Sequence, residues 1–451
     1  MISLARYRTA FSSAPLRRTF LISIIGRLPI GITGLAILVL VQSATGSFAR
    51  GGFAAGCYVS GLALAAPGLG RMIDRHGPRA VLRFCALAFP LALGLLIYGS
   101  EAAVPWLEAA AAAAAGASFP PITVCLRTYL RRALTDEALL SAAFSAESVL
   151  IELIFVVGPL VVAVFAATAA PALAVWFSAG CALVGTLVFL RSPALQGWRI
   201  ERGSATSLLG PLARRDFAHL VAIVLCFATA FGFLEIGITA YAVETSDAAL
   251  AGVLLGLMSA GSALGGLAYG SRAWHAPLAR QFAAALALTA AGLAVLAAPW
   301  QPWVFAVWSL LAGVAIAPAL IIQSMLVTKT APTEHSTEAF TWTTSALLAG
   351  VGIGLAFGGI LLERLPWSAA FLAGAAAALL SAAGARAFYA ASFSCMRPRR
   401  ASSAAGRRAP SLAKSSSCER NSSFHAAAST CVSSEKRAAL TLSSPVQFRS
   451  S

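Results

Sequence analysis

The sequence predicts an all-α integral membrane protein whose twelve transmembrane helices form two pseudo-symmetric halves of six helices each. Hydrophobic residues make up 59% of the 451 residues and charged residues only 11%, whereas soluble domains carry about 25% charged residues. The apolar residues gather in twelve runs that are long enough to cross a bilayer, and basic residues concentrate in alternate connections between these runs. This composition excludes a soluble enzyme, a disulfide-rich secreted domain and a disordered chain.

Each apolar run holds about 20 residues, the length of helix that crosses about 30 Å of hydrocarbon. The predicted spans are residues 19–41, 51–70, 80–99, 104–126, 141–167, 171–190, 217–243, 249–270, 278–298, 303–326, 338–362 and 367–388. The longest connection before the C-terminal tail, residues 191–216, is predicted to be a central cytoplasmic loop. It separates an N-terminal half (residues 1–190) from a C-terminal half (residues 217–391).

The positions of Lys and Arg predict the orientation, because cytoplasmic loops of membrane proteins are enriched in them. With the N-terminus in the cytoplasm, nineteen Lys and Arg residues before the tail fall on the cytoplasmic side, and only Arg50 and Arg364 fall on the other side. We therefore expect a multi-pass protein of the plasma membrane, the inner membrane of a bacterium, with both termini in the cytoplasm.

The net charge of +16 does not indicate a nucleic-acid partner once it is located along the chain. Half of it lies in residues 392–451, which hold ten Lys and Arg against two Asp and Glu. The other half is accounted for by the cytoplasmic loops. Residues 392–451 are rich in Ser and Arg and are predicted to form a disordered cytoplasmic tail.

The two halves share a repeated pattern. Gly116 and Pro121 in the fourth span recur 197 residues later, and three residues of the fifth span recur 196 residues later in the eleventh: Ala143 as Ala339, Phe144 as Phe340 and Gly158 as Gly354. Residues 29–37 of the first span also resemble residues 235–243 of the seventh. A maintained offset indicates a duplicated six-helix unit, and parallel repeats of this kind occur in transporters.

A motif follows the second span, where residues 70–79 read Gly-Arg-Met-Ile-Asp-Arg-His-Gly-Pro-Arg. This run resembles the signature of the major facilitator superfamily, which has a Gly, three residues, Asp-Arg, one residue, Gly and a nearby basic residue in the same loop. Gly70, Asp74, Arg75, Gly77 and Arg79 carry the match. The resemblance extends over roughly residues 15–390, because it includes the six-plus-six arrangement of spans.

The resemblance implies that this loop forms a cytoplasmic gate, in which charges pair with a neighbouring helix end in one conformation and release it in another. Glu338, at the start of the eleventh span, is the expected partner. The alternative is that the arginines only satisfy the positive-inside rule. The corresponding segment after the eighth span has Gly270 in place of the Asp, so we expect an asymmetric gate.

Four charged residues lie inside predicted spans, and an intramembrane charge is by default a candidate functional residue. Arg27 and Glu147 lie about 13 Å and about 12 Å from the inner ends of their helices, so they are placed to pair. Glu152 lies deeper and about 140° around the helix from Glu147. Glu235 lies in the seventh span. We interpret these residues as a proton-coupling group, with a fixed buried ion pair as the alternative.

The resemblance also implies that spans 1, 4, 7 and 10 line a central cavity. The cavity candidates are Thr33, Ser118, Thr123, Arg127, Thr239, Tyr241, Gln323 and Ser324. Glycines in the eighth and eleventh spans, among them Gly350, Gly354 and Gly358, are interpreted either as faces at the moving interface between halves or as static packing contacts.

Exporters of this superfamily often carry a Gly-Pro motif in the fifth span, and Gly158-Pro159 matches it in part, since Val162-Ala163 follows instead of Gly-Gly. Such exporters also tend to have an Arg four residues before Gly116, where this chain has Ala112. We predict a proton-coupled exporter of small amphipathic organic molecules that acts as a monomer in the lipid bilayer. A proton-coupled uptake symporter for a small metabolite is the alternative, and a non-transporting membrane sensor is a more remote one.

The sequence predicts no enzyme, metal site or cofactor. It holds no cluster of His, Cys or Ser/His/Asp at one membrane depth, and no nucleotide-binding Gly-Lys loop. The expected partners are therefore a small-molecule substrate, H+ and lipid.

Overall fold

Twelve helical segments of the chain are long and apolar enough to cross a membrane. They come from a computed structural model that describes residues 5–167, 170–198, 210–245 and 248–394. All regular secondary structure in these ranges is helical. The predicted fold class is therefore confirmed, whereas the predicted tail lies outside the described residues from residue 395 onward.

Each predicted span corresponds to one long helix or to two consecutive ones. The spans are formed in order by α2 (Ala14–Arg27) with α3 (Pro29–Thr45), α4 (Phe48–His76), α5 (Pro78–Glu101), α6 (Pro105–Ala117) with α7 (Ile122–Ala133), α8 (Glu137–Ala167), α9 (Pro171–Phe189), α11 (Arg215–Glu244), α12 (Ala248–Gly270), α13 (Leu278–Leu296), α14 (Pro302–Gly313) with α15 (Ile316–Thr330), α16 (Ser336–Leu362) and α17 (Ser368–Ser394). Short helices precede, connect or follow them: α1 (Ala5–Ala10), α10 (Pro193–Gln196), η1 (Gly210–Ala213) and η2 (Thr333–His335).

Prolines explain where many of these helices begin. Five of the spanning helices have proline as their first residue, namely α3, α5, α6, α9 and α14. Proline suits this position because its fixed φ is helical and its missing N–H is one that the first turn leaves unbonded. The same property divides span 4, where Pro120 and Pro121 separate α6 from α7, and span 10, where Pro318 follows the break between α14 and α15.

The breaks in spans 4 and 10 lie at repeated positions, since Pro121 and Pro318 are the pair that recurs at an offset of 197 residues. After each break the span continues as a separate helix, α7 in span 4 and α15 in span 10. Both spans were predicted as continuous, because hydropathy does not register an interruption of two to four residues.

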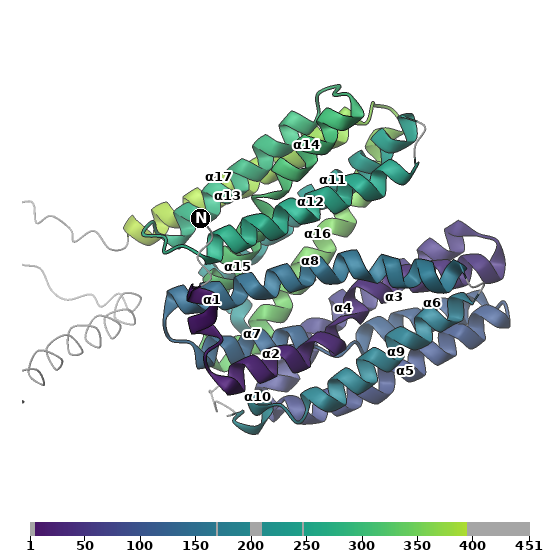
Figure 1. Ribbon diagram of the computed structural model, residues 1–451, viewed down its shortest axis with the longest axis horizontal. Helices are drawn as coiled ribbons and strands as arrows, with labels where there is room; N and C mark the ends of the chain where they lie inside the picture. The colour runs from purple at the N-terminus through teal and green to yellow at the C-terminus, as the bar shows by residue number, and fades with distance from the viewer. Residues whose placement is uncertain (1–4, 168–169, 199–209, 246–247, 395–451) are drawn as a thin grey trace, which may run out of the picture. The chain divides into compact units, whose positions relative to one another are not determined.

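The first six and the last six spans contact each other mainly through two helix pairs, α4 with α16 and α8 with α12. Figure 1 shows that the helices of the two sets converge at the end of the molecule that carries α1 and separate toward the opposite end. We refer to the converging end, which holds Tyr7, Asp74, Arg131 and Glu338, as the closed end.

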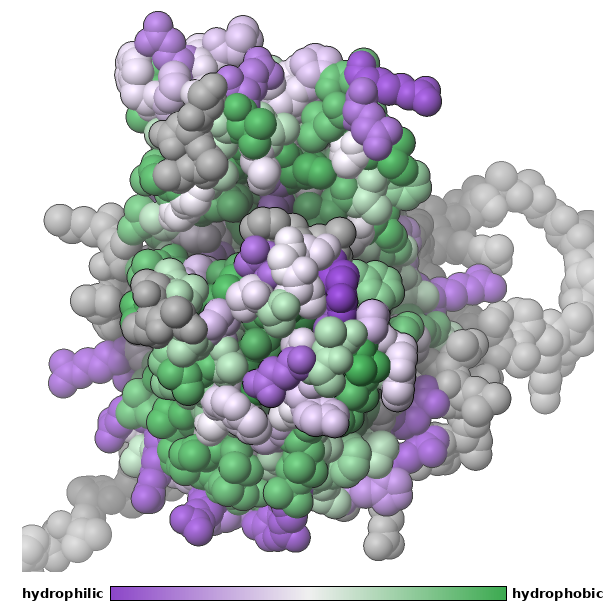
Figure 2. Space-filling model, turned by 90° about the vertical axis from the view of Figure 1, so that its right-hand side faces the viewer, coloured by the Kyte–Doolittle hydropathy of each residue, from purple (hydrophilic) through white to green (hydrophobic). Residues whose placement is uncertain are grey.

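Large apolar side chains cover the outside of the helices. Leu64, Leu91, Leu160 and Leu380 are each more than 60% exposed, far more than aliphatic side chains of a soluble protein core. Figure 2, which looks onto the end opposite the closed end, shows green apolar residues around the polar residues of the helix ends. Exposed leucines of this kind are favourable where lipid, not water, surrounds the helices.

Glycines bring helices of the same set into close contact. A Cβ on Gly354 of α16 would meet the backbone of Thr229 and Gly232 in α11, and a Cβ on Gly158 of α8 would meet the backbone of Gly31 in α3. Gly350 and Gly358 also face α11. The glycines of the eleventh span are thus static packing contacts, which corrects the alternative that they border the moving interface.

The repeat is visible in these contacts. Gly158 and Gly354, which are related by the offset of 196 residues, each pack against a glycine of the first span of their set. The packing therefore pairs Gly31 with Gly232. The sequence resemblance between residues 29–37 and 235–243 had instead paired Gly31 with Gly237.

We expect Gly354→Ala to lower the melting temperature of the purified protein. The added methyl group has to separate α16 from α11, and overpacking of this kind costs about 1–3 kcal/mol. Gly352→Ala is the matched control, because Gly352 lies in the same helix with no atom within 4 Å of its Cβ position. Equal melting temperatures for the two variants would contradict the close contact.

Candidate functional site

Asp74 joins the two sets of spans at the closed end. Its Oδ1 accepts a hydrogen bond from the backbone N–H of Thr337 at 3.1 Å, and its Oδ2 accepts one from the N–H of Glu338 at 2.8 Å. These two N–H groups lie in the first turn of α16, where backbone donors have no partner within the helix. A carboxylate at this position is also stabilised by the positive end of the helix dipole.

An ion pair between Arg71 and Glu338 lies beside the contact of Asp74. The carboxylate of Glu338 is fully buried and accepts hydrogen bonds from Nη2 of Arg71 at 2.6 Å and from Nε of Arg71 at 3.1 Å. Nδ1 of His335 lies 3.2 Å from the other carboxylate oxygen. Glu338 was the expected partner of the motif, but the arginine that binds it, Arg71, was not among the motif residues singled out.

The other motif residues have different positions. Gly70 packs so closely against Thr341 and Glu338 that a Cβ would clash there. Gly77 ends α4 with a φ of 83°, a left-handed conformation that favours glycine. The side chains of Arg75 and Arg79 are exposed, and Arg79 lies beside a surface pocket with Arg83 and Arg191.

Further contacts between the two sets of spans lie at the same end. Arg131 of α7 donates to the carbonyl oxygen of Ala331 and to Oγ of Ser336, both at 2.9 Å. The hydroxyl groups of Thr128 and Thr337 lie 3.3 Å apart. At the surface, Lys329 pairs with Glu137 at 2.7 Å. Several chemically different contacts thus hold this end together.

The short helix α1 supplies a contact that the sequence analysis missed. The hydroxyl group of Tyr7 donates to the carbonyl oxygen of Leu267 in α12 at 2.9 Å and lies 2.8 Å from Oγ of Ser145 in α8. Ser145 in turn donates to the carbonyl oxygen of Gly266. Burial raises the pKa of Tyr7, so its hydroxyl group keeps its proton. A six-residue helix shows no periodicity that would have indicated it.

A buried cluster of charges lies inside the first set of spans. Nη2 of Arg27 in α2 is 2.7 Å from Oε1 of Glu147 in α8, and Nε of Arg127 in α7 is 2.8 Å from Oε2 of the same carboxylate. Nε of Arg27 also donates to Oγ1 of Thr123 at 3.1 Å. The side chains of Arg27 and Glu147 are 0% and 1% exposed. The structure therefore brings together Arg27 and Glu147, which the sequence placed at equal depth.

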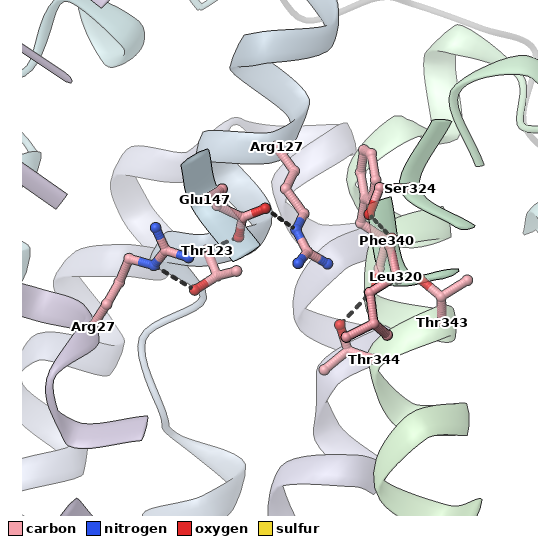
Figure 3. Close-up of polar contacts among 9 residues, drawn as sticks. All are labelled: Arg27, Thr123, Arg127, Glu147, Leu320, Ser324, Phe340, Thr343 and Thr344. Carbon is pink, nitrogen blue, oxygen red and sulfur yellow. Dashed lines mark hydrogen bonds and ion pairs between the residues drawn. The ribbon is translucent and has the colours of Figure 1, made fainter. Parts of the chain in front are cut away.

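Arg127 lies at the edge of this cluster. Its side chain is 15% exposed, and Figure 3 shows its guanidinium group between Glu147 on one side and Leu320, Phe340 and Thr344 of the second set on the other. Arg127 precedes Arg131 by one helical turn, so it lies directly inward of the contacts that hold the closed end.

The other two intramembrane carboxylates lie apart from the cluster. Glu152 of α8 accepts a hydrogen bond from Oγ of Ser262 in α12 at 2.6 Å, so it belongs to the contact between the two sets. The side chain of Glu235 in α11 is exposed. Both placements agree with the sequence argument that one cation does not serve Glu147 and Glu152 together.

Two expected cavity residues are buried within one set of spans instead. The hydroxyl group of Thr33 lies 2.7 Å from Oγ of Ser178 in α9, and Tyr241 stacks on Phe305 with ring centroids 4.1 Å apart. Gln323 is also buried, and its Oε1 has no hydrogen-bond partner. The direction in which a side chain points around its helix depends on the packing of neighbouring helices, which the sequence did not provide.

The partial exporter motif has a packing role in this structure. Gly158 touches Gly31, as described above, and Pro159 lies inside α8. A proline within a helix removes one backbone hydrogen bond and favours a bend. The motif therefore combines a close contact between α8 and α3 with a position in α8 that lacks one backbone hydrogen bond.

Twelve spans in two sets, joined at one end by ion pairs and helix-end contacts around buried charges, are an arrangement found in membrane transporters. The sequence matches the profile described as Major Facilitator Superfamily over residues 19–274, more than half of the chain. The chain belongs to this superfamily and is a secondary transporter. Among curated proteins, no sequence matches the chain significantly.

Solved structures share the fold at low sequence identity. A bacterial homologue of the iron transporter ferroportin, in an outward-facing state, aligns with a TM-score of 0.68 and 15% identity over 84% of this chain and 100% of its own. The human organic anion transporter MFSD10 aligns with a TM-score of 0.64 and 18% identity over 83% and 100%. FucP of E. coli, in the outward conformation, aligns with a TM-score of 0.65 and 14% identity over 83% and 98%.

We expect Asp74→Asn to weaken the closed end. The amide keeps one acceptor oxygen but loses the negative charge at the start of α16. Loss of a helix cap costs about 0.5–2 kcal/mol. We therefore expect the ratio of molecules with separated ends to molecules with joined ends to rise about two- to thirtyfold. Spin labels at the exposed positions Ala80 and Ala273, in a background without native cysteines, would measure this as a larger population of long distances.

Asp136→Asn is the matched control for this measurement. Oδ1 of Asp136 also accepts hydrogen bonds from backbone N–H groups at a helix start, but within its own helix α8. An equal distance distribution for Asp74→Asn, Asp136→Asn and the wild type would contradict the role of Asp74.

Proposed function

We propose that this transporter is a proton-driven exporter of small amphipathic organic molecules. It works by alternating access as a monomer in the inner membrane of a bacterium, with both termini in the cytoplasm. The observation that carries the proposal is the carboxylate of Glu147, held inside a spanning segment between Arg27 and Arg127.

A proton on Glu147 changes the contacts of both arginines. The ionised carboxylate accepts one charge-assisted hydrogen bond on each oxygen, and such bonds are about twice as strong as neutral ones. Protonation removes the negative charge that balances the arginines and leaves Arg127 less firmly held. Glu152 adds a second site, since its carboxylate bridges to Ser262 across the two sets of spans.

The conformation supports alternating access. With the N-terminus in the cytoplasm, the closed end is the cytoplasmic end, and the helices of the two sets lie apart at the outer end (Figure 1). The ferroportin homologue and FucP, which share the fold, were solved in outward-facing conformations.

The direction of transport is inferred from one motif and from the composition. The Gly158-Pro159 motif and the apolar composition favour export of amphipathic molecules. The solved relatives carry an organic anion, iron and fucose, so the shared fold does not select the substrate. Proton-coupled uptake is the second candidate, because the outward-open conformation is also the one that accepts a substrate from outside, and FucP is a fucose:proton symporter.

We expect cells that lack their main exporters and express the wild type to accumulate less of some fluorescent dyes and antibiotics, and an uncoupler to abolish the difference. Glu147→Gln is expected to lose about nine-tenths or more of the uncoupler-sensitive efflux, because the amide neither takes up nor releases a proton. Glu152→Gln is the second variant, and immunoblots of membranes check the amount of each protein.

Glu101→Gln is the control, because Glu101 is exposed at the end of α5. Higher uncoupler-sensitive accumulation in cells with the wild type would support uptake instead of export. Unchanged accumulation of every compound in the panel would overturn broad export.

A further inference from the structure

The buried cluster has more positive than negative charge. Two guanidinium groups, those of Arg27 and Arg127, share one carboxylate, that of Glu147. In the described residues neither arginine forms an ion pair with another acid, and Nη1 of Arg27 is buried without a hydrogen-bond partner. Since an unbalanced charge inside a membrane protein is costly, the extra positive charge calls for a functional explanation.

Arg127 is the arginine that retains binding capacity. Its Nε is used by Glu147, but neither of its Nη atoms has a hydrogen-bond partner among the described residues. Four N–H groups of a planar fork therefore remain, the arrangement that binds a carboxylate or sulfonate through two parallel hydrogen bonds. Arg27 has no such access, because its side chain is completely buried.

The position of Arg127 suits a substrate that approaches from the open end. The side chain is 15% exposed, and Figure 3 shows its guanidinium group on the side of Glu147 that faces Leu320, Phe340 and Thr344 of the second set. The next turn of α7 holds Thr128 and Arg131, which contact the second set and close the path beyond. A group bound to Arg127 thus lies one helical turn inward of the contacts that hold the closed end.

The opposite wall has a different chemistry. Figure 3 shows Leu320, Phe340 and Thr344 on this side, and the hydroxyl group of Thr344 already donates to the carbonyl oxygen of Phe340. Phe340 is completely buried against Phe144, whereas Leu320 and Thr344 are partly exposed. This wall therefore offers an apolar side chain and a hydroxyl acceptor, but no charge.

The repeat explains why only one side is charged. Counting the offset of 197 residues from Arg127 leads to Ser324, and the offset of 196 from Glu147 leads to Thr343. Both are uncharged residues, so the second set carries no counterpart of the ion pairs at these positions. A ligand between the two sets meets one cationic and one apolar side.

We propose that the substrate is an amphipathic organic monoanion, whose carboxylate or sulfonate binds the Nη atoms of Arg127 while its apolar part contacts Leu320. One negative charge balances the cluster, whereas a dianion overcompensates it and a cation is repelled. Arg27 is a positioning residue, since it holds the carboxylate of Glu147 that orients Arg127. This inference rests on the proposed transport function and narrows it.

Binding to the purified full-length protein tests the site without requiring transport. The probes are pairs of equal shape and different charge, naphthoate with naphthamide and phenylbutyrate with phenylbutyramide, together with naphthylmethylammonium as the cation. We expect at least one carboxylate to raise the melting temperature with saturation, and its amide and the cation to require at least tenfold higher concentrations. Equal effects of acid and amide in both pairs would overturn the proposal.

Arg127→Gln is expected to weaken carboxylate binding by about 10- to 150-fold, the equivalent of about 1.5–3 kcal/mol for a hydrogen bond to a charged group. Arg127→Lys, which keeps the charge but lacks the fork, should bind with intermediate affinity. Arg83→Gln is the control with the same loss of charge at an exposed position. Unchanged carboxylate binding by Arg127→Gln would contradict the site.

A measurement on the wild type covers the case in which Arg127→Gln does not fold. Phenylglyoxal modifies accessible guanidinium groups, and mass spectrometry of the peptide that contains Arg127 reports the extent. We expect the bound carboxylate, but not the amide, to protect Arg127 and to leave Arg83 unprotected. Equal modification of Arg127 with and without carboxylate would overturn the proposal.

The outcomes separate this inference from the proposed function. Saturable, Arg127-dependent carboxylate binding without any proton-driven efflux would support the anion site and overturn the exporter. Uncoupler-sensitive efflux of cationic and neutral compounds with no preference for anions would support the exporter and overturn the anion site.

Discussion

The contact between Asp74 and the first turn of α16 is the interaction on which the observed conformation depends. It connects the end of the second span with the start of the eleventh. The donors are two backbone N–H groups that have no partner within α16, and the helix dipole adds to the attraction. The contacts of Arg71, Arg131 and Tyr7 lie around it at the same end. Because all of them hold one end, the opposite ends of the two sets are free to separate, as Figure 1 shows.

The sequence predicted those features that depend on depth and composition. Twelve spans follow from apolar runs, and the approach of Arg27 to Glu147 follows from their similar distance from the helix ends. Features that depend on rotation around a helix were not predictable in this way. Thr33 and Tyr241 have suitable polarity and depth, but they face neighbouring helices of their own set. Arg71 was missed because its role depends on which motif side chain points toward α16.

The two sets of spans are alike in backbone and different in charge. Gly158 with Gly31 and Gly354 with Gly232 show the same close packing twice, and the prolines of spans 4 and 10 break both spans at matched positions. The ion pairs of Glu147 with Arg27 and Arg127, however, have no counterpart at the corresponding positions of the second set, where Ser324 and Thr343 correspond to Arg127 and Glu147. Duplication thus explains the framework, while later divergence of a few side chains explains the chemistry.

The acceptor at the closed end is a side chain, but its donors are backbone groups, the N–H of Thr337 and of Glu338. Every amino acid except proline presents such an N–H. Substitutions at position 337 therefore leave this bond intact, whereas nearly every substitution at position 74 removes it. For this one bond, selection therefore acts more strongly on position 74 than on position 337.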